Sequence, residues 1–227
     1  MTYNYDKECF MAKESFKTIY EGGTGEIIEK KSRFIATVIP IETEEEALAF
    51  IEAQKKQYWD ARHNCSAYVL GENHEIQRCS DDGEPSKTAG RPMLDVLLLE
   101  DIHNVCVVVT RYFGGTLLGT GGLVRAYQAA TKEGLNNSVI ITKQLGKKLK
   151  ITTDYNGIGK IQYIIGQRNI STLDTEYTDI VAVTILIAPS MEDEFRKKVI
   201  EATSNQAIFE DLETLYYTEL SGELITF

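Results

Sequence analysis

The sequence has no long hydrophobic run, few cysteines and fewer basic than acidic residues. None of its apolar stretches approaches the ~18–20 residues that a helix needs to span a bilayer. Its first sixteen residues, MTYNYDKECFMAKESF, lack the basic and apolar regions of a secretory signal. We therefore expect a cytoplasmic protein without a membrane partner.

Positive charge is scarce along the whole chain. The 227 residues include 24 lysines and arginines against 34 aspartates and glutamates, which gives a net charge of −10. Neither residues 1–140 nor residues 141–227 carry a net positive charge. Because a protein that coats duplex DNA needs many basic contacts to phosphate, the charge excludes bulk duplex-DNA binding. Any contact with nucleic acid is confined to a local patch.

Only four cysteines are present, at positions 9, 65, 79 and 106, and no two of them form a C-x-x-C pair. This spacing indicates no disulfide framework, and we expect reduced thiols. Cys106 lies in the apolar run Val105–Val109, which predicts a core position. Cys65 stands two residues after His63 and is an alternative catalytic nucleophile, although a nucleophile and its base must also meet in space.

Hydrophobic periodicity divides the chain into two α+β domains, residues 1–138 and 139–227. In the first domain, Thr43 and Glu46 form the capping-box signature of a helix start. The segment NVCVVVTRY at 104–112 contains five consecutive apolar residues, which predicts a central strand buried on both faces. The other elements expected in this domain are strands within 17–28 and at 32–39, 65–70 and 74–79, helices at 44–57, 92–99 and 122–135, and a loop at 81–90.

The second domain shows the order βαββαβ of the ferredoxin-like split βαβ sandwich. Asp154 is predicted to cap its first helix, Thr178-Asp179 to turn a hairpin, and Pro189 to start its second helix. The expected elements are a strand at 145–153, a helix at 155–167, strands at 170–177 and 180–187, a helix at 191–203 and a strand at 207–217.

Five glycines follow the central strand of the first domain, namely Gly114, Gly115, Gly119, Gly121 and Gly122. A glycine-rich turn from strand to helix offers backbone N–H groups and a positive helix end to an anion. The spacing excludes two nucleotide motifs, because Thr120 stands where a Walker A loop needs lysine and Val124 where the dinucleotide fingerprint needs its third glycine. The alternative is that the glycines only permit a tight crossing from strand to helix.

Two arginines flank this glycine loop. Arg111 is near the end of the central strand, and Arg125 lies in or near the first turn of the following helix, where a cation opposes the helix dipole. We therefore expect an anionic partner for them, either an external phosphate or an acidic side chain of the segment Asp81–Glu84.

Asp81, Asp82 and Glu84 place three carboxylates within four residues. Together with His63 they are the candidate catalytic residues, because carboxylates and histidine perform general acid–base chemistry. The alternative is a turn, since Asp-Gly is a common turn dipeptide. A short acidic loop without further ligands makes a poor Mg²⁺ site, so the sequence predicts no metal site and no cofactor.

Several aromatic side chains surround these motifs. They either form a platform on which bases stack or belong to the core or its rim. They are Tyr58, Trp59, Tyr68, Tyr112, Phe113 and Tyr127.

Four ordered blocks resemble the signature blocks of the YigZ/IMPACT family: KKSRFIATVIP at 30–40, DARHNCSAYVLG at 60–71, DDGEPSKTAG at 81–90 and TRYFGGTLLGTGGLVRAY at 110–127. The resemblance implies a first domain similar to the second domain of small-subunit ribosomal protein five, and a second domain similar to the fifth domain of elongation factor G. Both of these proteins act on the ribosome. The eukaryotic IMPACT protein restrains the amino-acid-starvation kinase by competing for its ribosome-associated activator. The sequence departs from the family pattern at Lys87, where glycine is usual, and at Leu117, where lysine is usual.

The resemblance favours a translation-associated or RNA-binding regulatory protein without catalysis, whose partner is RNA, the ribosome or a translation-related protein. The alternative is a hydrolase that acts on a phosphorylated or peptide substrate in a cleft between the loops 81–90 and 110–127. A protein-interaction module is a third hypothesis. The expected ligand- or anion-binding residues, with Asp81–Glu84 opposite, are Arg111, Gly114, Gly115, Gly119, Gly121, Gly122 and Arg125.

Overall fold

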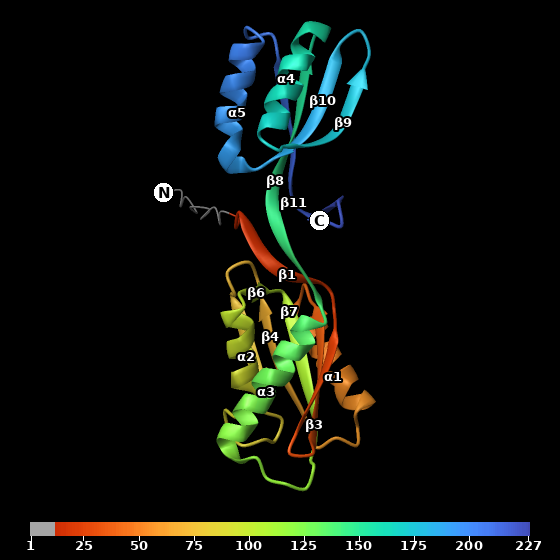
Figure 1. Ribbon diagram of the computed structural model, residues 1–227, viewed down its shortest axis with the longest axis vertical. Coiled ribbons are helices and arrows are strands. Elements are labelled where there is room, and N and C mark those ends of the chain that lie inside the picture. Colours follow the sequence, from red (N-terminus) through yellow and green to blue (C-terminus); the bar gives the residue numbers. More distant parts are fainter. Residues whose placement is uncertain (1–11) are drawn as a thin grey trace, which may run out of the picture. The chain divides into compact units, whose positions relative to one another are not determined.

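A computed structural model describes residues 12–227, so Cys9 lies outside the described residues. The described chain forms two compact units, residues 16–142 and residues 143–227 with 12–15. Helices and strands alternate in both units (Figure 1), which confirms a two-domain α+β protein.

The first unit contains a five-stranded sheet in which every neighbouring pair is antiparallel. The predicted central strand is β7 (Val105–Tyr112), and it does occupy the middle of the sheet. From one edge to the other the strands are β2 (Thr24–Glu29), β3 (Ser32–Pro40), β7, β4 (His63–Leu70) and β5 (Ile76–Ser80).

Helices cover both faces of this sheet, as Figure 1 shows. Helix α1 (Glu44–Gln57) packs on the face that buries Cys106 and Val108 of β7. Helices α2 (Gly90–Leu99) and α3 (Gly119–Asn136) pack on the face that buries the alternate residues Val105, Val107 and Val109. The five-residue apolar run is therefore buried on both sides, and Cys106 is a core residue as predicted.

Two strands of the first unit, β1 (Ser15–Glu21) and the short β6 (Ile102–His103), lie outside this five-stranded sheet. The segment 17–28 does contain two strands that separate at Gly22-Gly23, β1 and β2. However, β2 pairs with β3, whereas β1 pairs in parallel with β6. A two-residue strand has no hydrophobic period, so β6 could not be predicted from the sequence.

The second unit has the predicted order βαββαβ. Its elements are β8 (Val139–Thr153), α4 (Tyr155–Gln167), β9 (Ser171–Tyr177), β10 (Val181–Ile187), α5 (Pro189–Ala202) and β11 (Ile208–Leu220). The strands form the antiparallel order β9-β10-β8-β11, and both helices share one core with alternate residues of β8 and β10. A last strand, β12 (Glu223–Thr226), pairs with β11 across a turn in which Ser221 and Gly222 both have positive φ. Such a two-residue turn suits a hairpin.

The ends of the helices carry the predicted signals. The Thr43 hydroxyl accepts a hydrogen bond from the backbone N–H of Glu46 at 3.2 Å, and the Asp154 carboxylate accepts one from Gly157 at 2.7 Å. Pro189 is the first residue of α5. Among the described residues, no helix is both long enough and apolar enough to cross a membrane.

Replacing Thr43 with alanine removes the acceptor that caps α1. We expect the free energy of unfolding to fall by about 1 kcal/mol, measured by urea denaturation of the full chain. Thr43→Ser keeps the hydroxyl and is the control, with little expected change. Equal losses in both variants would show that the cap contributes nothing to stability.

Candidate functional site

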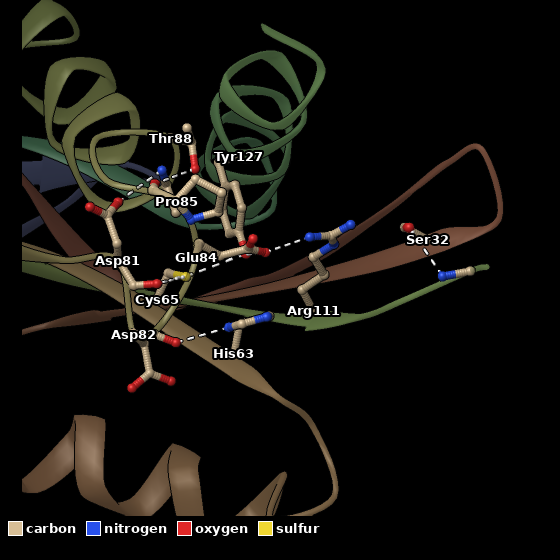
Figure 2. Close-up of polar contacts among 12 residues, drawn as sticks. Ser32, His63, Cys65, Asp81, Asp82, Glu84, Pro85, Thr88, Arg111 and Tyr127 are labelled. Atoms are coloured by element: carbon tan, nitrogen blue, oxygen red, sulfur yellow. Dashed lines mark hydrogen bonds and ion pairs between the residues drawn. The ribbon is translucent and has the colours of Figure 1, made fainter. Parts of the chain in front are cut away.

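A buried ion pair joins the acidic loop 81–84 to the end of β7. The Arg111 guanidinium lies 2.6 Å from Oε1 of Glu84, and their side chains are only 8% and 3% exposed. The hydroxyl of Tyr127, on α3, donates to the same carboxylate oxygen at 2.8 Å. Figure 2 shows these three side chains meeting. The anionic partner of Arg111 is therefore inside the protein.

Aromatic rings enclose this ion pair. The Arg111 guanidinium carbon lies 5.4 Å from the ring centre of Phe34 and 5.7 Å from that of Phe113. The Tyr127 ring meets Phe34 edge-on at 5.2 Å. Burial, above all, raises the pKa of Tyr127, so its hydroxyl keeps its proton and remains a donor to Glu84.

Asp81 holds the start of α2. One carboxylate oxygen accepts from the N–H groups of Ala89 and Gly90 at 3.0 and 2.9 Å, and the other accepts from the N–H of Lys87 at 2.7 Å. The N-cap residue of α2, Ala89, has no side chain that can do this. A carboxylate is well placed there, because the helix N-terminus carries partial positive charge.

Asp82 and His63 attach the acidic loop to β4, as Figure 2 also shows. One Asp82 carboxylate oxygen accepts from the N–H of Asn64 at 2.7 Å, and the other lies 3.5 Å from the Lys55 ammonium. Nδ1 of His63 lies 2.9 Å from the backbone oxygen of Asp82. The carboxylates of the acidic loop thus all bind protein donors, and His63 binds the loop's backbone.

Cys65 is fully buried between this loop and α3. Its sulfur lies 3.0 Å from the backbone oxygen of Asp81 and 3.3 Å from the hydroxyl of Tyr127. Burial raises the pKa of the thiol. Because only the thiolate is a strong nucleophile, these surroundings do not suit the catalytic cysteine considered from the sequence.

The glycines of the 114–122 loop serve different purposes. A Cβ atom on Gly114 would lie 2.0 Å from the backbone carbon of Lys31, so only glycine fits there. Gly115 and Gly119 have φ of +84° and +72°, which glycine adopts without strain. A tight strand-to-helix crossing therefore accounts for Gly114, Gly115 and Gly119. A Cβ on Gly122 would lie 2.9 Å from Cβ of Leu118, whereas Gly121 is exposed and has only the Arg125 side chain beside it.

The start of α3 differs from the prediction. The helix begins at Gly119 instead of residue 122, and Gly119 itself has a φ of +72°, which glycine adopts without strain. Arg125 is therefore in the second turn, where the helix dipole opposes its charge less. The N-cap residue, Leu118, makes no side-chain hydrogen bond to the first turn.

Arg125 is the second arginine of the motif, and its situation is opposite to that of Arg111. It is exposed and forms no ion pair with any described residue. Its guanidinium Nη1 lies 3.6 Å from where a Cβ on Gly121 would stand, so the side chain folds back over the first turn of the helix. Backbone N–H groups and a cation thus face solvent together at the start of α3.

A shallow pocket of about 210 Å³ lies beside this loop. The pocket brings the predicted residues His63 and Arg111 together, but no residue of the loop 81–90 lines it. That loop contacts Arg111 through the buried carboxylate of Glu84 instead. Arg62 also lines the pocket. The only signal for it in the sequence is its position next to His63. The full lining is Arg62, His63, Arg111, Phe113 and Leu117.

The six aromatic residues near these motifs differ in exposure, and Tyr58 and Tyr112 are half-buried. Tyr68 and Tyr127 are buried and belong to the core. Phe113, 51% exposed, and Trp59, 82% exposed, have faces open to solvent. Leu117 is 83% exposed and places an apolar side chain beside Phe113 in the pocket.

The backbone conformation at Lys87 explains why glycine is usual at this position of the family pattern. Lys87 has φ of +63°, the left-handed region in which glycine is favoured. Its N–H is one of the three donors to Asp81. Glycine adopts this backbone conformation without strain. Lysine adopts it here because the Asp81 carboxylate accepts hydrogen bonds from the N–H of Lys87 and from the N–H groups of Ala89 and Gly90.

Comparison with known proteins gives the following matches. Residues 30–135 match the family described as the Impact N-terminal domain, and residues 151–206 match a domain of unknown function, DUF1949. The IMPACT family member YvyE of Bacillus subtilis (strain 168) is 41% identical over 202 residues, which are 89% of this chain and 93% of YvyE. The IMPACT family member YigZ of Escherichia coli (strain K12) is 34% identical over 174 residues, 76% of this chain and 85% of YigZ. The crystal structure of a hypothetical protein, 30% identical, superposes with a TM-score of 0.56 and covers 88% of this chain and 98% of its own.

Replacing Glu84 with glutamine leaves the Arg111 charge buried without its counter-charge. We expect the free energy of unfolding to fall by about 3–5 kcal/mol, measured by urea denaturation. The control is Glu26→Gln, which breaks the half-exposed ion pair with Arg33 at 2.8 Å and is expected to cost less than about 1 kcal/mol. If the two variants lose the same stability, burial adds nothing to the Glu84–Arg111 interaction.

Thiol labelling tests the environment of Cys65. In a Cys9→Ser background, a thiol reagent at mildly alkaline pH should modify the exposed Cys79 first. Cys65 and Cys106 should react only on unfolding, because both are buried and burial raises the pKa of Cys106 to about 12. Mass spectrometry of labelled peptides distinguishes the three. Labelling of Cys65 as fast as Cys79 would make it a candidate nucleophile again.

Proposed function

The chain belongs to the IMPACT family, and we propose that it acts in translation as a regulatory protein that binds RNA phosphates at the start of α3. The family resemblance supports a role in translation, since the eukaryotic IMPACT protein competes for a ribosome-associated activator of a kinase. The proposal includes the finer resemblances, of the first domain to the second domain of small-subunit ribosomal protein five and of the second to the fifth domain of elongation factor G. Under this proposal, both domains resemble domains of proteins that act on the ribosome.

The observation that carries the proposal is the exposed Arg125 beside the uncapped first turn of α3. Unpaired N–H groups at a helix N-terminus bind phosphate oxygens, and a guanidinium adds a charge-assisted hydrogen bond. Arg111 offers no such contact, because Glu84 already binds it. The open surroundings of Gly121 and Gly119 let a phosphate approach the backbone closely.

The neighbouring pocket supplies contacts for a base. Phe113 presents an exposed ring, and Arg62 is a cation in the same pocket. Stacking on an aromatic ring is independent of base identity, and a nearby arginine contributes to binding. Leu117 stands where the family usually has lysine, so this chain has one cation fewer in the loop and depends more on Arg125.

The hydrolase alternative rests on His63, Asp81, Asp82 and Glu84. Each of the three carboxylates is bound to protein donors in ways that hold the loop in place, so this arrangement offers no support for acid–base chemistry. Metal-dependent turnover in a screen of phosphatase, nuclease and peptidase substrates, abolished by Asp82→Asn, would favour the hydrolase.

Replacing Arg125 with alanine should weaken co-sedimentation with ribosomes several-fold and lower the slope of log affinity against log salt by about 1. Lys132→Ala is the matched control, because Lys132 is an exposed cation further along the same helix. We expect it to leave binding near the wild-type value.

Two results would contradict the proposal. One is the absence of wild-type protein from every ribosomal fraction at low salt. The other is an equal loss of binding in both variants, which would show a general effect of net charge. Binding that survives treatment with RNase and is insensitive to salt would favour the third hypothesis, a protein-interaction module.

A further inference from the structure

Two histidines and an aspartate gather at the other end of β4 from His63. His74 lies between β4 and β5, while Asp101 and His103 lie just before β7. Nε2 of His103 lies 3.2 Å from Oδ1 of Asp101, and Nε2 of His74 lies 3.8 Å from the same oxygen. One nitrogen or oxygen from each of the three lies within 4.8 Å of the others.

We propose that His74, Asp101 and His103 bind a divalent transition-metal ion of the zinc class. Zinc takes nitrogen and oxygen ligands at about 2.0–2.2 Å in a tetrahedron, so two ligand atoms are then about 3.4 Å apart. The separation of 3.2 Å between His103 and Asp101 is close to this value, and Nε2 of His74 lies 3.8 Å from the same aspartate oxygen, within reach once its ring turns. Three protein ligands leave a fourth position for water or another ligand.

The surroundings of His103 are the main argument for a cation. The side chain is fully buried, and its two nitrogens both face oxygen acceptors: Nδ1 lies 3.1 Å from the backbone oxygen of Gly71, and Nε2 lies 3.2 Å from Asp101. A neutral imidazole carries only one N–H. If Nδ1 donates to Gly71, the Nε2 lone pair faces a carboxylate, and a positive charge between them stabilises this arrangement.

The contact with Gly71 is typical of a metal-binding histidine. Such histidines usually donate their second nitrogen to a carbonyl or carboxylate, which fixes the ring and leaves the other nitrogen free for the metal. Gly71 is itself held, since its N–H donates to the Asn104 side chain at 2.8 Å. The ring of His103 is therefore fixed before any metal arrives.

Transition-metal ions of the zinc class fit these ligands better than magnesium or calcium. Imidazole nitrogen suits zinc, copper and nickel, whereas magnesium and calcium prefer oxygen ligands alone. The imidazole rings of His74 and His103 are stacked, with centres 3.8 Å apart and 19° between their planes. Because nitrogen lone pairs lie in the ring plane, His74, which is partly exposed, has to turn out of this stack to bind the metal.

Isothermal titration of the metal-free full chain with ZnCl₂, in a background with serine at Cys9 and Cys79, measures binding directly. We expect one equivalent of Zn²⁺ and a visible spectrum of ligated Co²⁺ when that ion is used instead. His74→Ala and Asp101→Asn should each weaken binding at least tenfold. Both residues retain solvent exposure, so these variants should fold even if His103→Ala does not.

The third histidine of the chain gives a matched control. His63→Ala removes an imidazole from the same unit at the opposite end of β4, and it should bind Zn²⁺ like the parent. Zinc should raise the melting temperature of the parent and of His63→Ala but not of His74→Ala. Absence of zinc binding in the parent, or unchanged affinity in His74→Ala, would overturn the proposal. Nitrogen NMR showing both His103 nitrogens protonated in the presence of zinc would assign the cluster to an ion pair instead.

Discussion

The buried ion pair of Glu84 and Arg111 joins three segments that are distant in the sequence. Glu84 belongs to the loop before α2, Arg111 to the end of β7, and Tyr127, which donates to the same carboxylate, to α3. Transferring both charges out of water is costly, and only good geometry with additional hydrogen bonds compensates for it. The Tyr127 phenol supplies one additional hydrogen bond and aromatic rings enclose the pair, while Nε of Arg111 has no hydrogen-bond partner among the described residues. Two of the four sequence blocks that resemble the IMPACT family, 81–90 and 110–127, therefore meet at one carboxylate oxygen.

This interaction determines which groups remain for binding. Because Arg111 is neutralised internally, the exposed positive charge of the glycine loop is that of Arg125. The acidic loop is similarly occupied, since Asp81 stabilises the start of α2 and Asp82 holds β4. The carboxylates of Asp81, Asp82 and Glu84, which the sequence makes candidates for catalysis, thus serve to hold the acidic loop against its neighbouring elements. The groups that face solvent are found at the first turn of α3.

Much of the fold could be predicted because local signals and tertiary contacts agree. The apolar run of β7 and the caps Thr43 and Asp154 are examples, as is the order βαββαβ. The strands β6 and β12 could not be predicted, because one is too short for a period and the other depends on a two-residue turn. For the arginines of the glycine loop, the sequence offered an acidic side chain of Asp81–Glu84 or an external phosphate as partner, and it left open which arginine pairs with which carboxylate. Nothing in the spacing shows that Glu84 binds Arg111 while Arg125 remains exposed.

Lys87 shows how a departure from a family pattern acquires a physical meaning. The position requires a left-handed backbone, which favours glycine, and Asp81 binds the N–H there. Lysine at this position accepts backbone strain of about 1–2 kcal/mol, and it adds a cation to the acidic loop, whereas the separate glycine loop has leucine at position 117, where lysine is usual. In a chain with a net charge of −10, approach to RNA is opposed at long range. The proposed binding through one arginine and a helix start would release few counterions, which favours weak and reversible contact.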